Sequence, residues 1–331
     1  MSDPGRGLAA LVEALREMGL PAGALRPGAL LEDDLGLRPA RREEALRRAA
    51  AKLGREAPSL AAGRTLGDLA SALEGEPRAA AGLPLAGKVA FVSGSGHGLG
   101  KCLAVELAAR GATLVVNSFH SRERGEATTA ELCAAGREAV HIWGSVANPR
   151  QLDGIFEEIE GRFGRLDIFI QNASNGYLGP LRYAAPEHWE KSYRTNVVAL
   201  HQGALRAADL MKDGGSIAAL STPAAQRCTP LFGLQGSVKA AIEALVRYLA
   251  LELAPRRIRV NAYAPGPIYG ELLFRYPEAS RLIPTWEVLS SGHRLCTEPE
   301  VARSIVHFMT DPGLEASGSF VLSDAGVSKP M

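Results

Sequence analysis

The sequence lacks several features that mark specialised classes of protein. Its 331 residues contain no apolar run near the ~20 residues that span a bilayer. The first residues, Met-Ser-Asp-Pro-Gly-Arg, do not lead into the apolar core of a signal peptide. A formal net charge of +1 gives no overall attraction to nucleic acid or to an anionic membrane. We therefore expect a cytoplasmic protein that binds neither.

Cysteine is also scarce. The four cysteines lie far apart and form no C-x-x-C pair, which disfavours a structural zinc site and a secreted disulfide scaffold. The seven histidines form no H-x-x-x-H or H-E-x-x-H group, so we expect no metal site. Apolar residues make up 46% and charged residues 22% of the chain, which are ordinary globular values. The length allows one large domain and a small one.

Residues 1–76 carry only helical patterns. Apolar residues recur at helical spacing from Leu8 to Met18, and residues 39–54 give a second amphipathic stretch. Thr65 caps a third helix over residues 66–73. Residues 77–84, rich in Ala and Pro, have the composition of a linker. This part of the sequence predicts a small all-α domain followed by a linker.

From residue 85 the pattern changes to short apolar strands that alternate with helices. The predicted strands cover residues 89–92, 113–116, 140–143, 166–170, 216–220, 258–262 and 319–322. Apolar strands of this kind predict a parallel sheet with helices on both faces. The expected fold class is therefore α/β, with a doubly wound parallel (Rossmann) sheet over residues 85–331 and the small helical domain before it.

A glycine-rich loop, Ser-Gly-Ser-Gly-His-Gly-Leu-Gly over residues 93–100, follows the first strand and opens a helix. Glycine lets the backbone approach a pyrophosphate, and the start of the helix offers free N–H groups to the phosphates. The strand–turn–helix context is the one that a dinucleotide site requires. The candidate phosphate-binding residues are Gly94, Ser95, Gly98, Leu99 and Gly100; a purely structural turn is the alternative.

The end of the second strand bears on which nucleotide binds. NAD-preferring proteins place Asp or Glu there for the ribose hydroxyls, whereas this chain has Asn117, followed by Arg122 and Arg124. His97 stands within the glycine loop. Because guanidinium groups suit a 2′-phosphate, we predict NADP rather than NAD as the cofactor. The alternative is that these arginines only solvate a loop.

Further motifs follow the glycine loop in a fixed order. They are Leu85-Ala-Gly-Lys-Val, Gly164–Ser174, Asn196, Gly215-Ser-Ile, Lys239–Leu245, Arg259-Val-Asn-Ala, Pro265-Gly266 and Ser323–Gly326. With them, residues 85–328 resemble the short-chain dehydrogenase/reductase family, most closely its NADPH-dependent enoyl-acyl-carrier-protein reductases. The resemblance implies that Asn172 and Ala173 line the adenosine side of the site. It also implies that Pro265, Gly266 and Ile268 flank the nicotinamide.

The resemblance implies a catalytic set that this chain retains only in part. The family uses a tyrosine as acid, a lysine that holds the ribose and lowers the pKa of that tyrosine, a hydroxyl residue and an asparagine. The last three match Lys239, Thr222 and Asn196. The two positions at which family members carry the tyrosine hold Gln235 and Phe232. A glutamine can donate a hydrogen bond to an oxyanion but cannot deliver a proton at neutral pH.

Three hypotheses about function therefore stay open. In the one we favour, the chain is an NADP-dependent reductase of an enoyl or keto thioester held on a carrier protein, in polyketide or fatty-acid-like synthesis. Its proton then comes from water, a relayed hydroxyl, or a displaced tyrosine such as Tyr177 or Tyr269. In the second, the chain catalyses another reaction, such as isomerisation or cyclisation. In the third, it is a non-catalytic scaffold that assembles with an active homologue.

Two later segments carry further expectations. Residues 267–296 read as a long, mostly irregular and apolar segment, which in the family closes over the substrate and suits an acyl chain; plain packing onto the sheet is the alternative. Residues 238–253 predict a helix that is apolar almost all round. Family members assemble through this helix, so we expect a homodimer or homotetramer.

Residues 7–75 resemble an acyl carrier protein through Leu30–Leu37 and Gly63–Leu69. Where a carrier continues with Asp-Ser-Leu, this chain has Arg38-Pro39-Ala40, and proline cannot bear a phosphopantetheine arm. The second helix is basic on one face, which predicts docking of an acidic acyl carrier protein; a merely solvated face is the alternative. The residues of this face are Arg41, Arg48 and Lys52.

Overall fold

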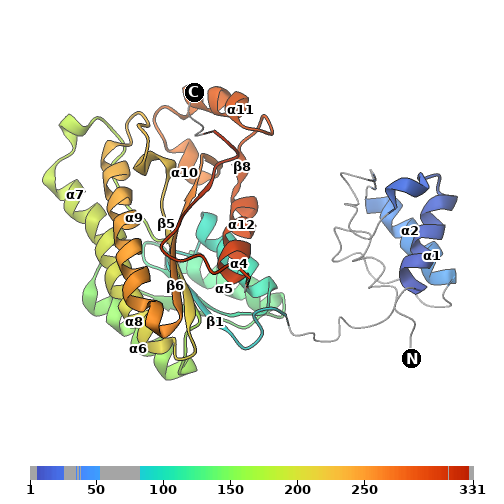
Figure 1. The fold of residues 1–331 in the computed structure, drawn as a ribbon, viewed down its shortest axis with the longest axis horizontal. Helices are drawn as coiled ribbons and strands as arrows, with labels where there is room; N and C mark the ends of the chain where they lie inside the picture. The colour runs from blue at the N-terminus through green and yellow to red at the C-terminus, as the bar shows by residue number, and fades with distance from the viewer. Residues whose placement is uncertain are drawn as a thin grey trace. The chain divides into compact units, whose positions relative to one another are not determined.

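The computed structural model describes residues 6–25, 35, 37, 39–52, 83–311 and 313–327. The chain divides into two compact units, residues 1–83 and 84–331, both drawn in Figure 1. No described helix combines the length and the apolar composition that crossing a bilayer requires.

In the first unit, the described residues form two α-helices and one short 3-10 turn. They are α1 (Arg6–Glu17), η1 (Ala22–Ala24) and α2 (Pro39–Lys52). The helical spacing places Leu11 and Leu15 of α1 and Leu46 of α2 in one buried cluster. The predicted helix over residues 66–73, most of Leu30–Leu37 and most of the linker 77–84 lie outside the described residues.

The second unit is built on a parallel sheet of seven strands in the order β3-β2-β1-β4-β5-β6-β9. Because these short runs are rich in Val, Ile and Phe, most of their residues are buried. The predicted doubly wound parallel sheet is confirmed. The strands are β1 (Val89–Val92), β2 (Thr113–Ser118), β3 (Ala139–Trp143), β4 (Ile168–Gln171), β5 (Gly215–Leu220), β6 (Ile258–Pro265) and β9 (Phe320–Ser323).

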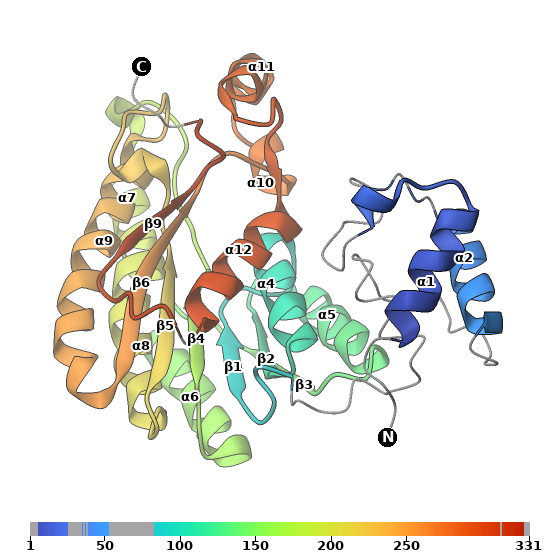
Figure 2. The same ribbon diagram turned by 45° about the vertical axis from the view of Figure 1, so that its right-hand side comes forward.

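Helices cover both faces of this sheet, as Figure 2 shows. One face carries α4 (Gly98–Ala109), α5 (Arg122–Ala134) and α12 (Glu298–Thr310). The other carries α6 (Pro149–Phe163), α8 (Ala199–Leu210) and α9 (Gly233–Leu253), with α7 (Pro186–Tyr193) and a π-helical turn, η3 (Arg194–Val198), leading into α8. Each layer closes its own apolar core against the sheet.

The strand order reverses between β1 and β4. These two strands lie side by side, although 75 residues, which include β2 and β3, lie between Val92 and Ile168 in the chain. In a doubly wound sheet, ligands bind beyond the carboxyl ends of the strands at such a reversal. The loops after β1 and β4 therefore bound the expected site.

The segment 267–296 differs from the expectation that it is mostly irregular. It contains β7 (Ile268–Tyr269), α10 (Glu271–Phe274), α11 (Ala279–Leu289) and β8 (Cys296–Thr297). The sequence pattern did not indicate these helices, because they are short and α11 contains Pro284. Strands β7 and β8 pair in parallel, so both ends of the segment meet at the same place.

Candidate active site

The glycine loop has a backbone shape that other residues resist. Gly94 and Gly98 have φ angles of +63° and +59°, in the left-handed region. A Cβ on Gly100 would lie 2.3 Å from the carbonyl oxygen of Gly94 and 2.5 Å from Nδ2 of Asn172. The loop therefore folds tightly onto the start of α4, as the pattern of glycines predicts.

Two predicted cofactor residues turn their side chains into the protein. Asn117, 2% exposed, accepts from the N–H of Gly94 at 3.1 Å and donates to two backbone carbonyls at the end of β3, both at 3.0 Å. The hydroxyl of Ser95 donates to the carbonyl of Val92 and accepts from the N–H of Asn117. Both side chains shape the loop, so a nucleotide there would meet their backbone.

The loop after β4 is bonded directly to the glycine loop. Asn172 donates from Nδ2 to the carbonyls of Ser93 and Gly94, each at 3.0 Å. The Ser93 hydroxyl accepts from the N–H groups of Asn172 and Ala173. Ala173 also lies under Gly94, where an added Cβ would come within 3.0 Å of its Cα. The two loops at the strand reversal thus form one rigid rim.

The first turn of α4 offers an anion site. The preceding residue, His97, is extended and gives the helix no side-chain cap. The N–H groups of Gly98, Leu99 and Gly100 therefore belong to the helix end that attracts anions. With the glycine loop beneath it, this backbone fits the diphosphate of a dinucleotide.

The residues predicted to flank the nicotinamide lie at the ends of β6 and β9. Pro265 pairs with Ser323, and the N–H of Gly266 donates to the carbonyl of Ser323 at 3.1 Å. A Cβ on Gly266 would lie 2.6 Å from that of Asp324, so this position also requires a glycine. Ile268 opens β7 and packs against the apolar core.

The two arginines predicted for the 2′-phosphate lie in different surroundings. Arg122 lies over the Trp143 ring, 5.8 Å from its centroid, whereas Arg124 pairs with Glu271. Nη1 of Arg124 lies 3.3 Å from Oε2 of Glu271, and Nδ1 of His97 lies 3.7 Å from the same atom. Burial, and then repulsion from Arg124, lowers the pKa of His97.

A second carboxylate, which the sequence reasoning missed, lies beside the loop. A Cβ on Gly98 would lie 3.4 Å from Oε1 of Glu298, and one on Gly270 would lie 2.2 Å from it. Burial raises the pKa of Glu298, and the nearby Glu271 raises it further. Neither glutamate stands in a recognisable motif, so only the fold reveals them.

Asn196 is fixed in the π-helical turn and is 1% exposed. Its Nδ2 donates to the carbonyls of Asn175 and Ser192 at 2.9 and 2.8 Å. Its Oδ1 accepts from the Ser174 hydroxyl at 2.9 Å. The asparagine thereby ties the loop after β4 to the helices that carry the rest of the site.

Lys239 lies on the buried side of α9 and donates from Nζ to the carbonyl of Leu220 at 2.7 Å. Burial lowers the pKa of this ammonium to about 7. One turn further along α9, the buried Glu243 accepts from the Ser221 hydroxyl at 2.6 Å. Thr222, beside Ser221, accepts from the N–H of Ala224 at 3.4 Å and caps the 3-10 turn η4 (Pro223–Ala225).

Gln235 stands one turn before Lys239 on α9, packed against Gly176. A Cβ on Gly176 would lie 1.7 Å from Nε2 of Gln235, so only glycine leaves room for this amide. Within the described part of the chain, Oε1 of Gln235 is buried and has no hydrogen-bond partner. An orphaned acceptor of this kind is costly and indicates a place for a ligand.

Phe232 and the two tyrosines considered as substitute acids each contact another side chain. Phe232 packs edge-on against Tyr276 with ring centroids 5.3 Å apart. Tyr177 stacks on His188 at 4.8 Å, and the Tyr269 hydroxyl donates to Glu287. That hydrogen bond raises the pKa of Tyr269.

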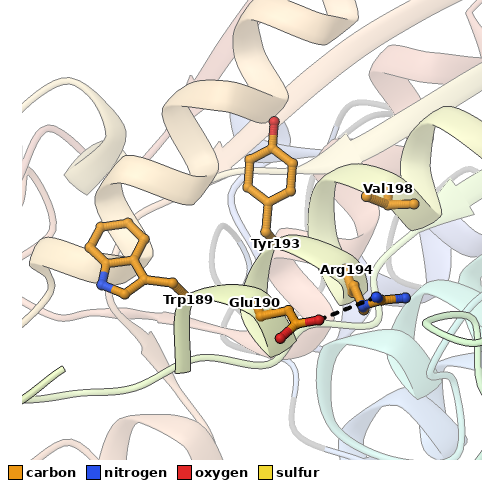
Figure 3. Close-up of a pocket in the computed structure, with 5 residues that line it drawn as sticks. All are labelled: Trp189, Glu190, Tyr193, Arg194 and Val198. Atoms are coloured by element: carbon orange, nitrogen blue, oxygen red, sulfur yellow. Dashed lines mark hydrogen bonds and ion pairs between the residues drawn. The ribbon is translucent and has the colours of Figure 1, made fainter. Parts of the chain in front are cut away.

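An open depression lies apart from these residues, on the outer side of α7 and η3 (Figure 3). An ion pair of 3.2 Å joins two of its lining residues, Arg194 and Glu190. None of the predicted site residues lines it. The lining residues are Trp189, Glu190, Tyr193, Arg194 and Val198.

Comparison with known proteins decides the family. Residues 94–328 match the family model described as enoyl-(acyl carrier protein) reductase. A 1-cyclohexenylcarbonyl-CoA reductase of Streptomyces collinus is 33% identical over 243 residues, which cover 73% of this chain and 87% of the relative. This chain belongs to the short-chain dehydrogenase/reductase family. It is accordingly an oxidoreductase of that type.

Other members of the short-chain dehydrogenase/reductase family are similar to this chain over nearly their whole length. A hydroxynaphthalene reductase of Aspergillus fumigatus is 32% identical, covering 72% of this chain and 91% of its own length. A solved short-chain dehydrogenase/reductase of Serratia marcescens has a TM-score of 0.69 at 28% identity and covers 74% of this chain and 99% of its own. One from Burkholderia cenocepacia, solved in complex with NADP, has a TM-score of 0.69 at 27% identity, with the same coverage.

The family match begins at residue 94, so α1 and α2 lie outside it. The basic residues predicted for docking have partners within their own unit. Lys52 pairs with Glu13 and Glu17 at 3.0 and 2.7 Å. Arg48 pairs with Glu44 at 2.7 Å, and Arg41 donates to the carbonyl of Met18. Lys52 and Arg48 are therefore paired with carboxylates, whereas the bond of Arg41 to a carbonyl leaves its charge in place, and docking of a carrier protein stays a prediction.

Proposed function

We propose that this chain is an NADP-dependent reductase of an enoyl thioester carried on a carrier protein. The observation that carries the proposal is the pair Gln235 and Lys239, one turn apart on α9, where Gln235 packs against Gly176 in the loop after β4. The buried Oε1 of Gln235 has no hydrogen-bond partner in the described part of the chain, and its Nε2 lies against Gly176. Lys239 offers a proton at neutral pH.

The missing tyrosine favours the enoyl substrate over the keto substrate. Reduction of a ketone creates an alkoxide on one oxygen, which needs an acid in place as the hydride arrives. Reduction of an enoyl thioester creates an enolate, in which the charge is shared between oxygen and carbon. An amide N–H such as that of Gln235 stabilises the enolate oxygen by hydrogen bonding. The proton is then added to carbon in a separate step.

The glycine loop would hold a nicotinamide nucleotide, which when bound would supply the hydride. Gln235 donates to the thioester oxygen, and Asn196 keeps the loop after β4 in position. Lys239 gives its proton to the enolate carbon directly or through one water, since a pKa near the working pH suits an acid. Names of two matches support this assignment, the enoyl-(acyl carrier protein) reductase model and the cyclohexenylcarbonyl-CoA reductase.

The test follows the absorbance of NADPH with crotonyl- and acetoacetyl-thioesters of a carrier protein. We expect oxidation of NADPH with the crotonyl thioester and none with the acetoacetyl thioester. Gln235→Leu should lower the rate by roughly 100-fold, as removal of an oxyanion donor does. The variant should leave the affinity for NADPH unchanged.

Each other outcome has a distinct meaning. Oxidation with the acetoacetyl thioester alone would make the chain a ketoreductase. Oxidation with neither thioester, despite nucleotide binding, would favour the repurposed or non-catalytic hypothesis. An unchanged rate in Gln235→Leu would remove this residue from the reaction.

A further inference from the structure

We infer that Glu271 is a built-in counter-anion of the 2′-phosphate pocket and sets the preference of this chain between NADP(H) and NAD(H). The inference rests on the proposed function, because it requires a nicotinamide nucleotide at the glycine loop. It assigns a role to a residue of the segment 267–296, which the sequence reasoning connected only with the substrate.

Glu271 is the first residue of α10 and contacts basic side chains from two other elements. Its Oε2 lies 3.3 Å from Nη1 of Arg124 in α5 and 3.7 Å from Nδ1 of His97 in the glycine loop. Its Oε1 accepts from Arg275. In the described part of the chain, Glu271 is the one carboxylate that pairs with either Arg124 or His97.

Arg124, which is always charged, and the His97 imidazole stand where the fold brings the adenosine ribose. His97 closes the glycine loop, and Arg124 lies in the first turn of the helix after β2, whose end faces the ribose in this fold. Arg122, the other arginine predicted for the 2′-phosphate, is held over Trp143 and pairs with Glu126 at 3.5 Å. Donors that converge on one oxygen from two elements form a ready anion site.

A carboxylate already in this site affects the binding of NADP(H) and of NAD(H) differently. The 2′-phosphate of NADP(H) must displace Glu271 from Arg124 and His97, since two anions this close repel each other. NAD(H) carries hydroxyls there and meets no such competition. Glu271 therefore weakens the binding of NADP(H) selectively, and binding of NADP(H) releases the start of α10 from the glycine loop.

The experiment is isothermal titration of wild type, Glu271→Gln and the control Glu126→Gln. The control removes a carboxylate from the same region, but one that pairs with Arg122. The probes are NADPH and NADH, with 2′,5′-ADP and 5′-AMP as fragments without nicotinamide. Glu271→Gln should bind NADPH and 2′,5′-ADP roughly fivefold more tightly, as the loss of a competing surface ion pair allows. Its affinities for NADH and 5′-AMP, and all affinities of the control, should stay unchanged.

A double variant makes the test specific. Adding Arg124→Gln to Glu271→Gln should abolish the gain for NADPH, because the released cation is then absent. An equal ratio of NADPH to NADH affinity in wild type and Glu271→Gln would overturn the inference while the proposed function stands. Weaker NADH binding by Glu271→Gln would overturn it too, since Glu271 would then be a ribose ligand. If neither wild type nor any of the variants binds a nucleotide, the proposed function fails and the inference fails with it.

Discussion

At the scale of single residues, Lys239 shows how burial creates chemistry. An exposed lysine keeps its proton far above neutral pH, and loses it too reluctantly to act as an acid. The apolar surroundings of Lys239 penalise the ammonium, and its one hydrogen bond goes to the carbonyl of Leu220. The same burial that suits the group to proton transfer makes its charge a cost to the fold.

This cost predicts a pH dependence of stability in the nucleotide-free protein. The pKa of Lys239 is about 7 in the folded chain and ~10.4 when unfolded, so the unfolded state binds more protons between these values. The lysine therefore destabilises the fold fully below about pH 7, and the loss disappears as pH rises toward about 10. Lys239→Met should remove this rise, which is on the order of a few kcal/mol.

Denaturant unfolding across this pH range measures the effect. Lys101→Met is the control, because Lys101 lies at the surface and pairs with Glu131. Its pH profile should follow that of wild type. Parallel profiles for Lys239→Met and wild type would show that the ammonium carries no cost.

At the scale of elements, the turn from β1 into α4 depends on close contacts between backbone atoms. Gly100 lies against the carbonyl of Gly94, and Asn172 bonds the same carbonyl from the next loop. The rim therefore depends on the absence of one methyl group. A side chain here would push the loop away from the place where the diphosphate binds.

Gly100→Ala should accordingly cost about 1–3 kcal/mol of stability, in the range of overpacked sites, and weaken NADPH binding. The matched control is Gly154→Ala in α6, where an added Cβ meets nothing within 4 Å. That substitution should stabilise the fold by about 0.4–1 kcal/mol, because the unfolded chain loses entropy. Unfolding curves and a fluorescence titration of NADPH check both; equal effects of the two would refute the steric account.

At the scale of the whole molecule, helices α8 and α9 leave apolar side chains on the surface. Tyr248 and Leu251 of α9 are 66% and 73% exposed, and Leu205 of α8 is 40% exposed. The two helices lie side by side (Figures 1 and 2). Tyr248 and Leu251 are three positions apart on α9 and so share a helix face, and exposed apolar residues grouped on one face are typical of an interface. We propose that this face joins two copies of the chain.

Light scattering with size-exclusion chromatography tests this assembly. Wild type should run as a dimer or tetramer, and the double variant Tyr248→Glu/Leu251→Glu should run as a smaller species. Leu272→Glu is the control, since Leu272 is 69% exposed on α10, away from this face. A monomeric wild type, or equal effects of both variants, would contradict the proposal.

The sequence by itself determined the strands of the sheet and the glycine loop, whereas Asn196 and Lys239 are predicted only by the family resemblance. The strands and the loop are local, because the period of apolar residues and a turn of glycines depend on neighbours in the chain. The resemblance also predicts that Gln235 and Phe232 occupy the positions of the family tyrosine. The bounds of the short helices α10 and α11 were beyond it, since their pattern is brief and interrupted.

The tertiary structure alone decided which side chains face the site. It turned Asn117 inward, placed Arg124 rather than Arg122 beside the loop, and set Gln235 against Gly176. Arg124 and Glu271 lie 147 positions apart in the chain, so no local pattern relates them. Such contacts arise when packed elements meet, and their strength depends on burial and distance, which a sequence does not contain.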